Sequence, residues 1–159
     1  MMNKKILCCC LVLVACLLLS GCGQQTPQAA DTRTCAEIAD EVQRAAGFRE
    51  LMDMTEKYME KYLLVDAADM EEWVMRRDAS KATPEMVILL EVKEGADQAA
   101  IKKLVQEFLD EQISLFKGYQ PEKVFMMENA KVQEKGRMIA LLVSPDPEKS
   151  DAALGEGWK

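Results

Sequence analysis

The spacing of apolar residues predicts a helix at the start of the folded part of the chain. Ile38 and Val42 lie about one helical turn apart, as expected for the buried side of an amphipathic helix. Thr34 and Glu37 match a capping box, in which each side chain bonds to the backbone of the other residue. Gly47 follows as a stop signal. We therefore expect a helix between Thr34 and Gly47.

The next segments predict a second helix and then two strands. An apolar stripe along 49–63 is typical of a helix, and the polar stretch 66–69 indicates its end. Residues 72–77 (EWVMRR) alternate like a strand. Residues 85–93 (EMVILLEVK) are apolar on both faces. We expect this second strand in the middle of a sheet, covered on both sides.

The clearest helix pattern runs over 96–117, where apolar residues recur every three or four positions. Gly118 is expected to end this helix, and Pro121 follows it. A hairpin is then predicted from 130–134 and 137–144, with a Lys-Gly turn between them. Its second arm (RMIALLVS) is again apolar on both faces.

The chain closes with a short predicted helix. Asp146 can cap it, Pro147 suits its first position and Gly155 can end it. In order, the elements predict an α+β fold with a four-stranded antiparallel sheet from two hairpins (ββαββ). The long helix would cross over between the hairpins and cover one face, with amino-terminal helices giving cover elsewhere.

The first residues have a different character. Lys4 and Lys5 precede an apolar run over 6–19 of about 14 residues, shorter than the roughly 20 that a membrane-spanning helix needs. Such a pattern predicts a secretory signal peptide. The run ends in LSGC, which resembles a bacterial lipobox, so we expect cleavage between Gly21 and Cys22 and a lipid on the Cys22 thiol. The alternative is an ordinary signal peptide with a chance cysteine. The polar, proline-containing stretch that follows favours the lipobox.

The expected organisation has three parts: a lipoprotein signal peptide over 1–21, a lipidated cysteine and flexible tether over 22–33, and a single globular domain over 34–159. Each buried methylene of an acyl chain contributes about 0.8 kcal/mol to membrane binding, and a lipidated amino-terminal cysteine carries at least two chains. The membrane partner is then reached through the lipid at Cys22. The domain is expected on the extracytoplasmic face of the cell membrane.

The charge of the chain limits its partners. The net charge is −7, and removal of residues 1–21 would take away two lysines and no acidic residue. An acidic surface repels nucleic acid and anionic headgroups, so we expect no nucleic-acid partner.

The chain has no histidine, which excludes Ser-His and Cys-His triads and histidine zinc sites. Of its six cysteines, four lie in the predicted signal peptide, leaving Cys22 and Cys35. We expect no catalytic residue, cofactor or metal ion. Cys35 is interpreted as a small apolar residue on a helix face, and the alternative is a disulfide between two chains through Cys35.

Acidic residues are the abundant reactive side chains. The candidates for a general acid and base pair, as in glycoside hydrolases, are Glu71, Glu72, Glu85, Asp110 and Glu111. The alternative interpretation is that these residues belong to a solvated surface.

Two methionine pairs could bind Cu(I), because thioethers favour that ion. These pairs are Met52 with Met54 and Met126 with Met127. As an alternative, the methionines fill gaps in the core.

Two tryptophans could present a stacking surface for a glycan or peptide. Trp73, on a predicted strand, is expected in the core, and Trp158, after two glycines, is expected to be mobile or loosely docked.

Several strings together resemble a family catalogued as domain of unknown function 4358, lipoproteins of Gram-positive bacteria. They are the LSGC motif, the stretch 82–124 (ATPEMVILLEVKEGADQAAIKKLVQEFLDEQISLFKGYQPEKV), the arm KGRMIALLVS and the closing DPEKSDAA. The resemblance covers nearly all of the mature chain. It implies an extracytoplasmic, lipid-anchored α+β domain and no catalytic residues. The family usually has an aromatic residue after the hairpin glycine, where this chain has Arg137 and Met138.

A permanent anchor on a domain without the usual catalytic side chains predicts a non-catalytic binding or accessory module. Its expected partner is an envelope protein or peptide. The alternative functions are a cell-envelope hydrolase using paired carboxylates and a purely structural or oligomeric role.

The anchor makes a direct prediction. Replacing Cys22→Ser removes the thiol that takes the lipid, so the variant should leave the membrane pellet while the native chain stays in it. Mass analysis of the mature amino terminus should find acyl chains on Cys22. A variant that sediments with membranes as firmly as the native chain would contradict the anchor.

Overall fold

The structure, a computed structural model, describes residues 32–159. The predicted signal peptide, the cleavage site at Gly21 and Cys22, and nearly all of the tether lie outside the described residues. The described helices and strands are α2 (Cys35–Ala46), β1 (Leu51–Asp53), α3 (Glu56–Leu63), β2 (Met70–Asp78), β3 (Met86–Val92), α4 (Gln98–Tyr119), α5 (Val124–Glu128), β4 (Val132–Lys135), β5 (Met138–Val143) and α6 (Pro147–Leu154).

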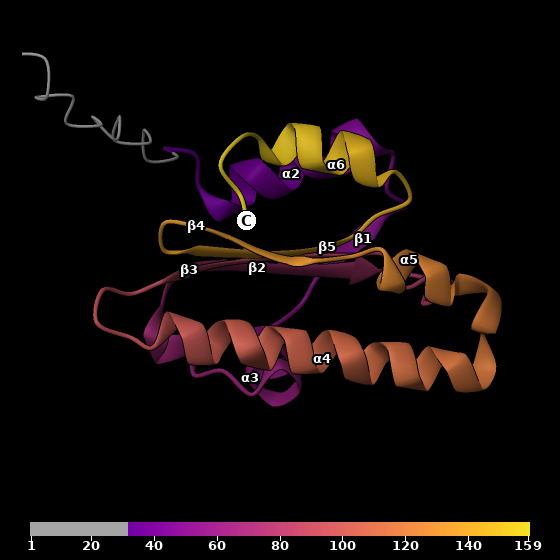
Figure 1. Cartoon of the computed structure of the whole chain (residues 1–159), viewed down its shortest axis with the longest axis horizontal. Helices are drawn as coiled ribbons and strands as arrows, with labels where there is room; N and C mark the ends of the chain where they lie inside the picture. Colours follow the sequence, from indigo (N-terminus) through magenta and orange to yellow (C-terminus); the bar gives the residue numbers. More distant parts are fainter. Residues whose placement is uncertain (1–31) are drawn as a thin grey trace, which may run out of the picture.

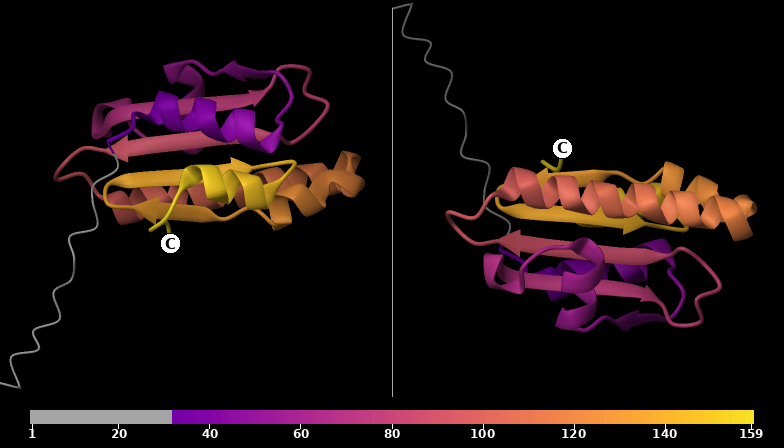
Figure 2. Two further views of the ribbon diagram at one scale, coloured as in Figure 1. Left: turned by 90° about the horizontal axis from the view of Figure 1, so that it is seen from above. Right: turned by 90° about the horizontal axis from the view of Figure 1, so that it is seen from below.

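The strands form one antiparallel sheet with the order β1-β2-β3-β5-β4. The two predicted hairpins, β2-β3 and β4-β5, are confirmed, and they join through the pairing of β3 with β5. Helices cover both faces, with α2 and α6 above the sheet in Figure 1 and α3 and α4 below it. The views of Figure 2 place α2 over β2 and β3, and α4 under β4 and β5.

The core has two parts, one on each face of the two central strands. Along β3, Ile88 and Leu90 face the layer of α3, α4 and α5, whereas Val87 and Leu89 face the layer of α2 and α6. All six residues of β5 are buried as well. The expectation of central strands covered on both faces is confirmed.

The predicted number of four strands is wrong, because a fifth strand lies where a helix was expected. The stripe over 49–63 predicts one helix, but Leu51–Asp53 pairs with β2 and α3 begins only at Glu56. Thr55 caps α3 by accepting the Tyr58 N–H at 3.3 Å. The open edge of β2 gains backbone hydrogen bonds from β1, and this tertiary pairing outweighs the helical stripe.

The predicted ends of α2 agree with the structure, whereas the predicted start of the second helix and the predicted end of α4 do not. Thr34 and Glu37 form the capping box, and Gly47 ends α2 with a φ of 68°. Helix α4, however, continues through Gly118 to Tyr119, so the predicted end at Gly118 is wrong. An internal glycine costs a helix only about 1 kcal/mol, a cost that the apolar face of α4 can offset.

The carboxy-terminal residues are docked against the domain. Trp158 packs against the α2 and α6 layer and its indole N–H donates to the Leu154 carbonyl at 3.2 Å. Lys159 exchanges two backbone hydrogen bonds with Glu134 on β4, of 2.8 and 3.1 Å. The expectation that Trp158 is mobile or loosely docked is therefore wrong. Trp73, expected in the core, is partly buried against the α4 side of it.

Among residues 32–159, no helix combines the length and the apolar character that crossing a membrane requires.

Candidate functional site

A cleft of about 500 Å³ opens where β1, α3, the end of α4 and the loop after β2 meet. We call it the aromatic cleft. Four aromatic side chains, a methionine and an arginine dominate its walls: Met52, Tyr58, Tyr62, Arg77, Phe116 and Tyr119. The chain has three tyrosines, and all of them line this cleft.

The aromatic rings form two stacked pairs. Tyr58 and Tyr62, one turn apart on α3, have ring centroids 4.1 Å apart. Phe116 and Tyr119, on the last turn of α4, have centroids 4.8 Å apart. Both spacings place the rings on one side of their helix, where they support each other.

Part of this apolar surface is open to solvent. The described residues leave six large apolar side chains exposed: Met52, Tyr62, Leu64, Leu115, Tyr119 and Phe125. Three of these six line the aromatic cleft, with Tyr119 at 61% exposure the most open of the three. Apolar surface concentrated in a concave site is typical of a ligand or partner site.

Arg77 lies half-buried on the cleft wall. Its guanidinium donates hydrogen bonds to the Tyr58 hydroxyl and, at 3.3 Å, to Oε1 of the buried Gln112. Both acceptors are neutral. The neighbouring Arg76 points to the opposite face of the sheet, where it pairs with Asp40 at 2.6 Å and Asp53 at 2.8 Å.

The loop after β2 forms the rim of the cleft and is organised by Asp78. The buried Asp78 carboxylate accepts hydrogen bonds from the backbone N–H and the hydroxyl of both Ser80 and Thr83, each with a shortest distance of 2.8 or 2.9 Å. Burial disfavours the charge, but these hydrogen bonds outweigh it and lower the pKa of Asp78 to about 2. The bonds hold Lys81 on the rim with a φ of 58°, a left-handed conformation that non-glycine residues seldom adopt.

One wall of the cleft is also a sheet edge. Met52 and Asp53 of β1 line the cleft, and β1 ends the described strand order, so no described strand lies beside its outer edge. An edge of this kind presents backbone N–H and C=O groups that can pair with another chain.

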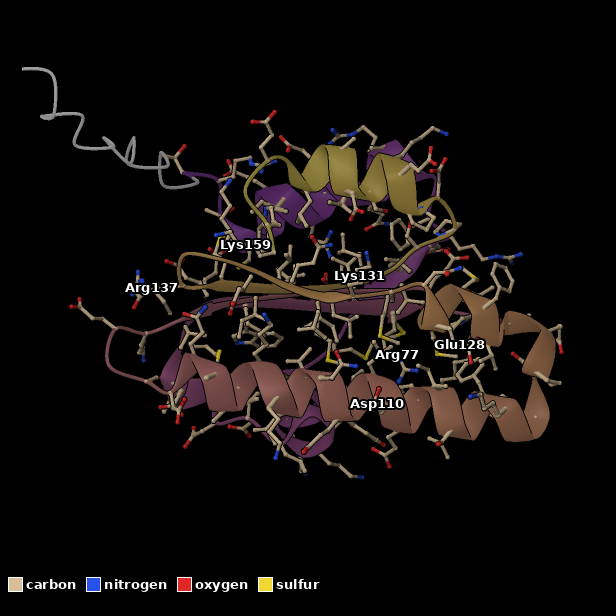
Figure 3. All side chains as sticks on the ribbon, in the orientation of Figure 1. Arg77, Asp110, Glu128, Lys131, Arg137 and Lys159 are labelled. Atoms are coloured by element: carbon tan, nitrogen blue, oxygen red, sulfur yellow. The ribbon has the colours of Figure 1, made fainter. Side chains whose placement is uncertain are left out.

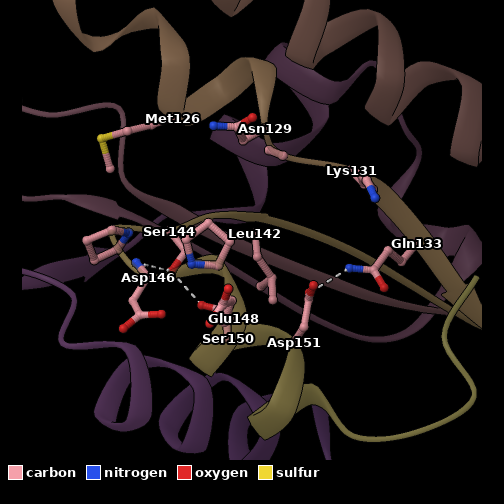
Figure 4. A pocket seen from close by; sticks show the side chains of 13 residues that line it. Met126, Asn129, Lys131, Gln133, Leu142, Ser144, Asp146, Glu148, Ser150 and Asp151 are labelled. Atoms are coloured by element: carbon pink, nitrogen blue, oxygen red, sulfur yellow. Dashed lines mark hydrogen bonds between the residues drawn. The ribbon is translucent and has the colours of Figure 1, made fainter.

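A second groove, of about 460 Å³, lies between α6 and the chain leading into β4 (Figure 4). Several of its polar groups bond to one another. The Ser150 hydroxyl donates to the Ser144 hydroxyl at 2.5 Å, and the Gln133 amide donates to Asp151 at 3.1 Å. The groove has no aromatic lining, so we treat the aromatic cleft as the better candidate site.

The sequence-predicted acids are not brought together. Glu72 accepts the Cys35 N–H at 3.0 Å, Glu85 is buried and accepts the Arg49 N–H at 2.7 Å, and Asp110 on α4 accepts from Gln106. The exposed Glu71 and Glu111 lie on β2 and α4.

Glu72 directly faces another acid, Glu91, across the β2-β3 pair. Glu91 is held by Arg137 at 2.9 Å, and neither acid lines the aromatic cleft or the second groove. In the described part of the chain, no three acidic or cysteine side chains are grouped as metal ligands.

The two methionine pairs lie in different parts of the domain, and only Met52 and Met54 share a cavity. Met52 and Met54 line the aromatic cleft, Met126 lines the second groove, and Met127 is buried in the core.

Cys35 has no accessible surface, and burial, together with the charges of Glu72 and Glu91, raises the pKa of its thiol to about 12. Its interpretation as a small buried residue is confirmed. A buried, protonated thiol cannot form the alternative disulfide between folded chains.

Comparison with known proteins identifies one family. The family described as Domain of unknown function (DUF4358) matches residues 44–144, which span β1 to β5 and both walls of the aromatic cleft. No curated protein and no solved structure has significant similarity to the chain.

The Asp78 site predicts a specific loss of stability in acid. Because the pKa of Asp78 is about 2 in the folded chain and 3.8 ordinarily, the stabilisation is present above pH 3.8 and is lost as the pH falls through 2. Urea unfolding at a series of pH values should show a drop of about 2 kcal/mol that the variant Asp78→Asn lacks. Asp110→Asn, at an exposed acid, should keep the drop. An identical acid profile for the native chain and Asp78→Asn would contradict this assignment.

Proposed function

The chain belongs to the DUF4358 family, whose function is unknown, and we propose that it is a membrane-anchored lipoprotein whose domain binds a peptide segment of an envelope protein. In this proposal Cys22 carries the lipid after cleavage at Gly21, and the domain lies on the extracytoplasmic face of the cell membrane. The domain is a binding module and catalyses no reaction.

The observation that carries the proposal is the aromatic cleft beside the edge of β1, next to which no described strand lies. Tyr62 and Tyr119 expose rings at the mouth of a cavity large enough for one or two side chains. Tyrosine is enriched at binding surfaces because it combines a rigid apolar ring with a polar hydroxyl. A surface of this kind is costly to leave in water unless a partner covers it.

The edge of β1 favours an extended peptide as the occupant. A peptide that adds a strand to β1 would form backbone hydrogen bonds irrespective of its sequence. Side chains alternate along a strand, so every second residue of the peptide would point to the side of the sheet where Met52 and Tyr62 lie. The edge would then provide affinity, and the aromatic cleft would select the side chain.

The alternative of a hydrolase with paired carboxylates has no support at this site. The acids on the aromatic cleft are Asp53 and Asp78. Asp53 is bonded to Arg76, and Asp78 is enclosed by the loop after β2. Neither is placed as a proton donor opposite a second carboxylate, as glycoside hydrolysis requires.

A displayed library of random decapeptides tests the proposal on the full chain held in detergent micelles. We expect enrichment of extended peptides with an aromatic or branched aliphatic side chain. Tyr119→Ala should lower the affinity for the enriched peptides by about tenfold or more, because it removes one stacking ring of the cleft. The matched control is Phe125→Ala, since Phe125 is 60% exposed and lies outside the cleft. It should leave the affinity within about twofold of native.

Two results would contradict the proposal. The first is the absence of any enriched peptide. The second is a set of enriched peptides that bind Tyr119→Ala as tightly as the native chain.

A further inference from the structure

The charge of Arg77 is not neutralised within the described chain. A half-buried guanidinium usually has a carboxylate partner, because burial removes part of its hydration. Arg76 follows this pattern with Asp40 and Asp53. Arg77 has two hydrogen bonds, to Tyr58 and Gln112, and no carboxylate lies within ion-pair distance of it among residues 32–159.

The guanidinium of Arg77 therefore has N–H groups that are available to bind a further acceptor. An arginine carries five N–H groups in a planar fork, and the two bonds of Arg77 leave three of them for other acceptors. The fork matches the two oxygens of a carboxylate. Figure 3 shows Arg77 between the sheet and α4, on the side where Tyr58 and Phe116 line the cleft.

A second cation stands on the same cleft. Lys81 lies on the rim and forms no ion pair with an acid among the described residues. Of the two acids that line the cleft, Asp53 pairs with Arg76, whereas Asp78 accepts hydrogen bonds from uncharged groups of the loop after β2. The aromatic cleft thus carries two cations, Arg77 and Lys81, that form no ion pair among the described residues, and one buried carboxylate, Asp78, whose hydrogen-bond donors are uncharged. Together these three side chains carry a net positive charge. A partner that meets this surface gains most by bringing a negative group.

We propose that the aromatic cleft selects a carboxylate next to an aromatic or aliphatic side chain. The carboxylate would bind the Arg77 fork with Lys81 nearby, and the apolar side chain would lie against Tyr62 and Tyr119. The carboxylate can come from a Glu or Asp side chain or from the end of a peptide chain. This inference rests on the proposed peptide-binding function and adds the chemistry of the peptide.

Matched synthetic pentapeptides test the inference on the full chain in detergent micelles. One arm contains peptides with an aromatic residue next to Glu, blocked at both ends, and the same peptides with Gln in place of Glu. A second arm contains peptides without Glu that have either a free or an amidated carboxyl end. Binding is measured by titration. We expect the carboxylate member of a pair to bind about tenfold tighter than its neutral partner, because charge-assisted hydrogen bonds are the stronger ones.

Variants assign the preference to the guanidinium. Arg77→Gln should remove the difference in affinity between the carboxylate peptide and the neutral peptide of a pair. Arg77→Lys should keep only part of this difference. Arg137→Gln is the control, since Arg137 pairs with Glu91 at the far end of the sheet in Figure 3 and should leave the difference unchanged. In the native chain, the difference should shrink as the ionic strength rises. This last test does not depend on the folding of a variant.

The inference is overturned if carboxylate and neutral peptides bind equally, or if the preference survives in Arg77→Gln. If carboxylate and neutral peptides bind equally and Tyr119→Ala still weakens their binding, only the preference for a carboxylate is refuted. The proposed peptide-binding function is then retained. If no pentapeptide binds and no library peptide is enriched, the proposed function fails together with the inference.

Discussion

The pairing of β3 with β5 is the constraint on which the other parts of the structure depend. Both strands are apolar on both faces, so neither can lie at a surface or at an edge of the sheet. Ile88 and Leu141, cross-strand partners, face α4, while Leu89 and Ala140, also partners, face α2. Each fully buried large aliphatic side chain contributes about 1.5–3 kcal/mol. Burial on both faces therefore requires two helical layers, and the sheet holds the layers together.

This arrangement also creates the aromatic cleft. Strand β2 continues the sheet outward from β3, and its consecutive residues Arg76 and Arg77 point to opposite faces. On the α2 face the acids of two elements surround Arg76 and neutralise it. On the other face α3 and the end of α4 supply tyrosines and Gln112 around Arg77. The same alternation that builds the core thus leaves Arg76 paired with two carboxylates and Arg77 with neutral acceptors among the described residues.

The sequence predicted a helix or strand well where that element is stabilised by its own residues. The starts of α2 and α6 follow from their own residues, the capping box at Thr34 and the proline at Pro147. The two central strands are apolar on both faces, so their burial could also be predicted from their own residues. Strand β1 was missed because its stability comes from β2, which follows it by a whole helix. The end of α4 was misplaced because packing of the helix outweighs the propensity of Gly118.

The candidate site could not be predicted because its residues come from distant segments. Met52, Tyr58, Arg77 and Tyr119 follow no common spacing and meet only after the sheet and helices have packed. One signal for the site was available in the sequence: two of the three tyrosines lie a helical turn apart, which places their rings on the same side of a helix. The conclusion that histidine chemistry is excluded needs no structure. The lipid anchor at Cys22 remains a prediction from sequence.

Hydrogen exchange of the α4 amides, in the native chain and in Leu89→Ala, tests most directly whether the two layers form one unit. Leu89 faces the α2 and α6 layer, and its truncation should cost about 2–5 kcal/mol. If β3 and β5 join the layers as described, the most protected amides of α4 on the opposite face lose the same free energy of opening as those of α2. Protection of α4 that stays at its native value while that of α2 falls would contradict this account.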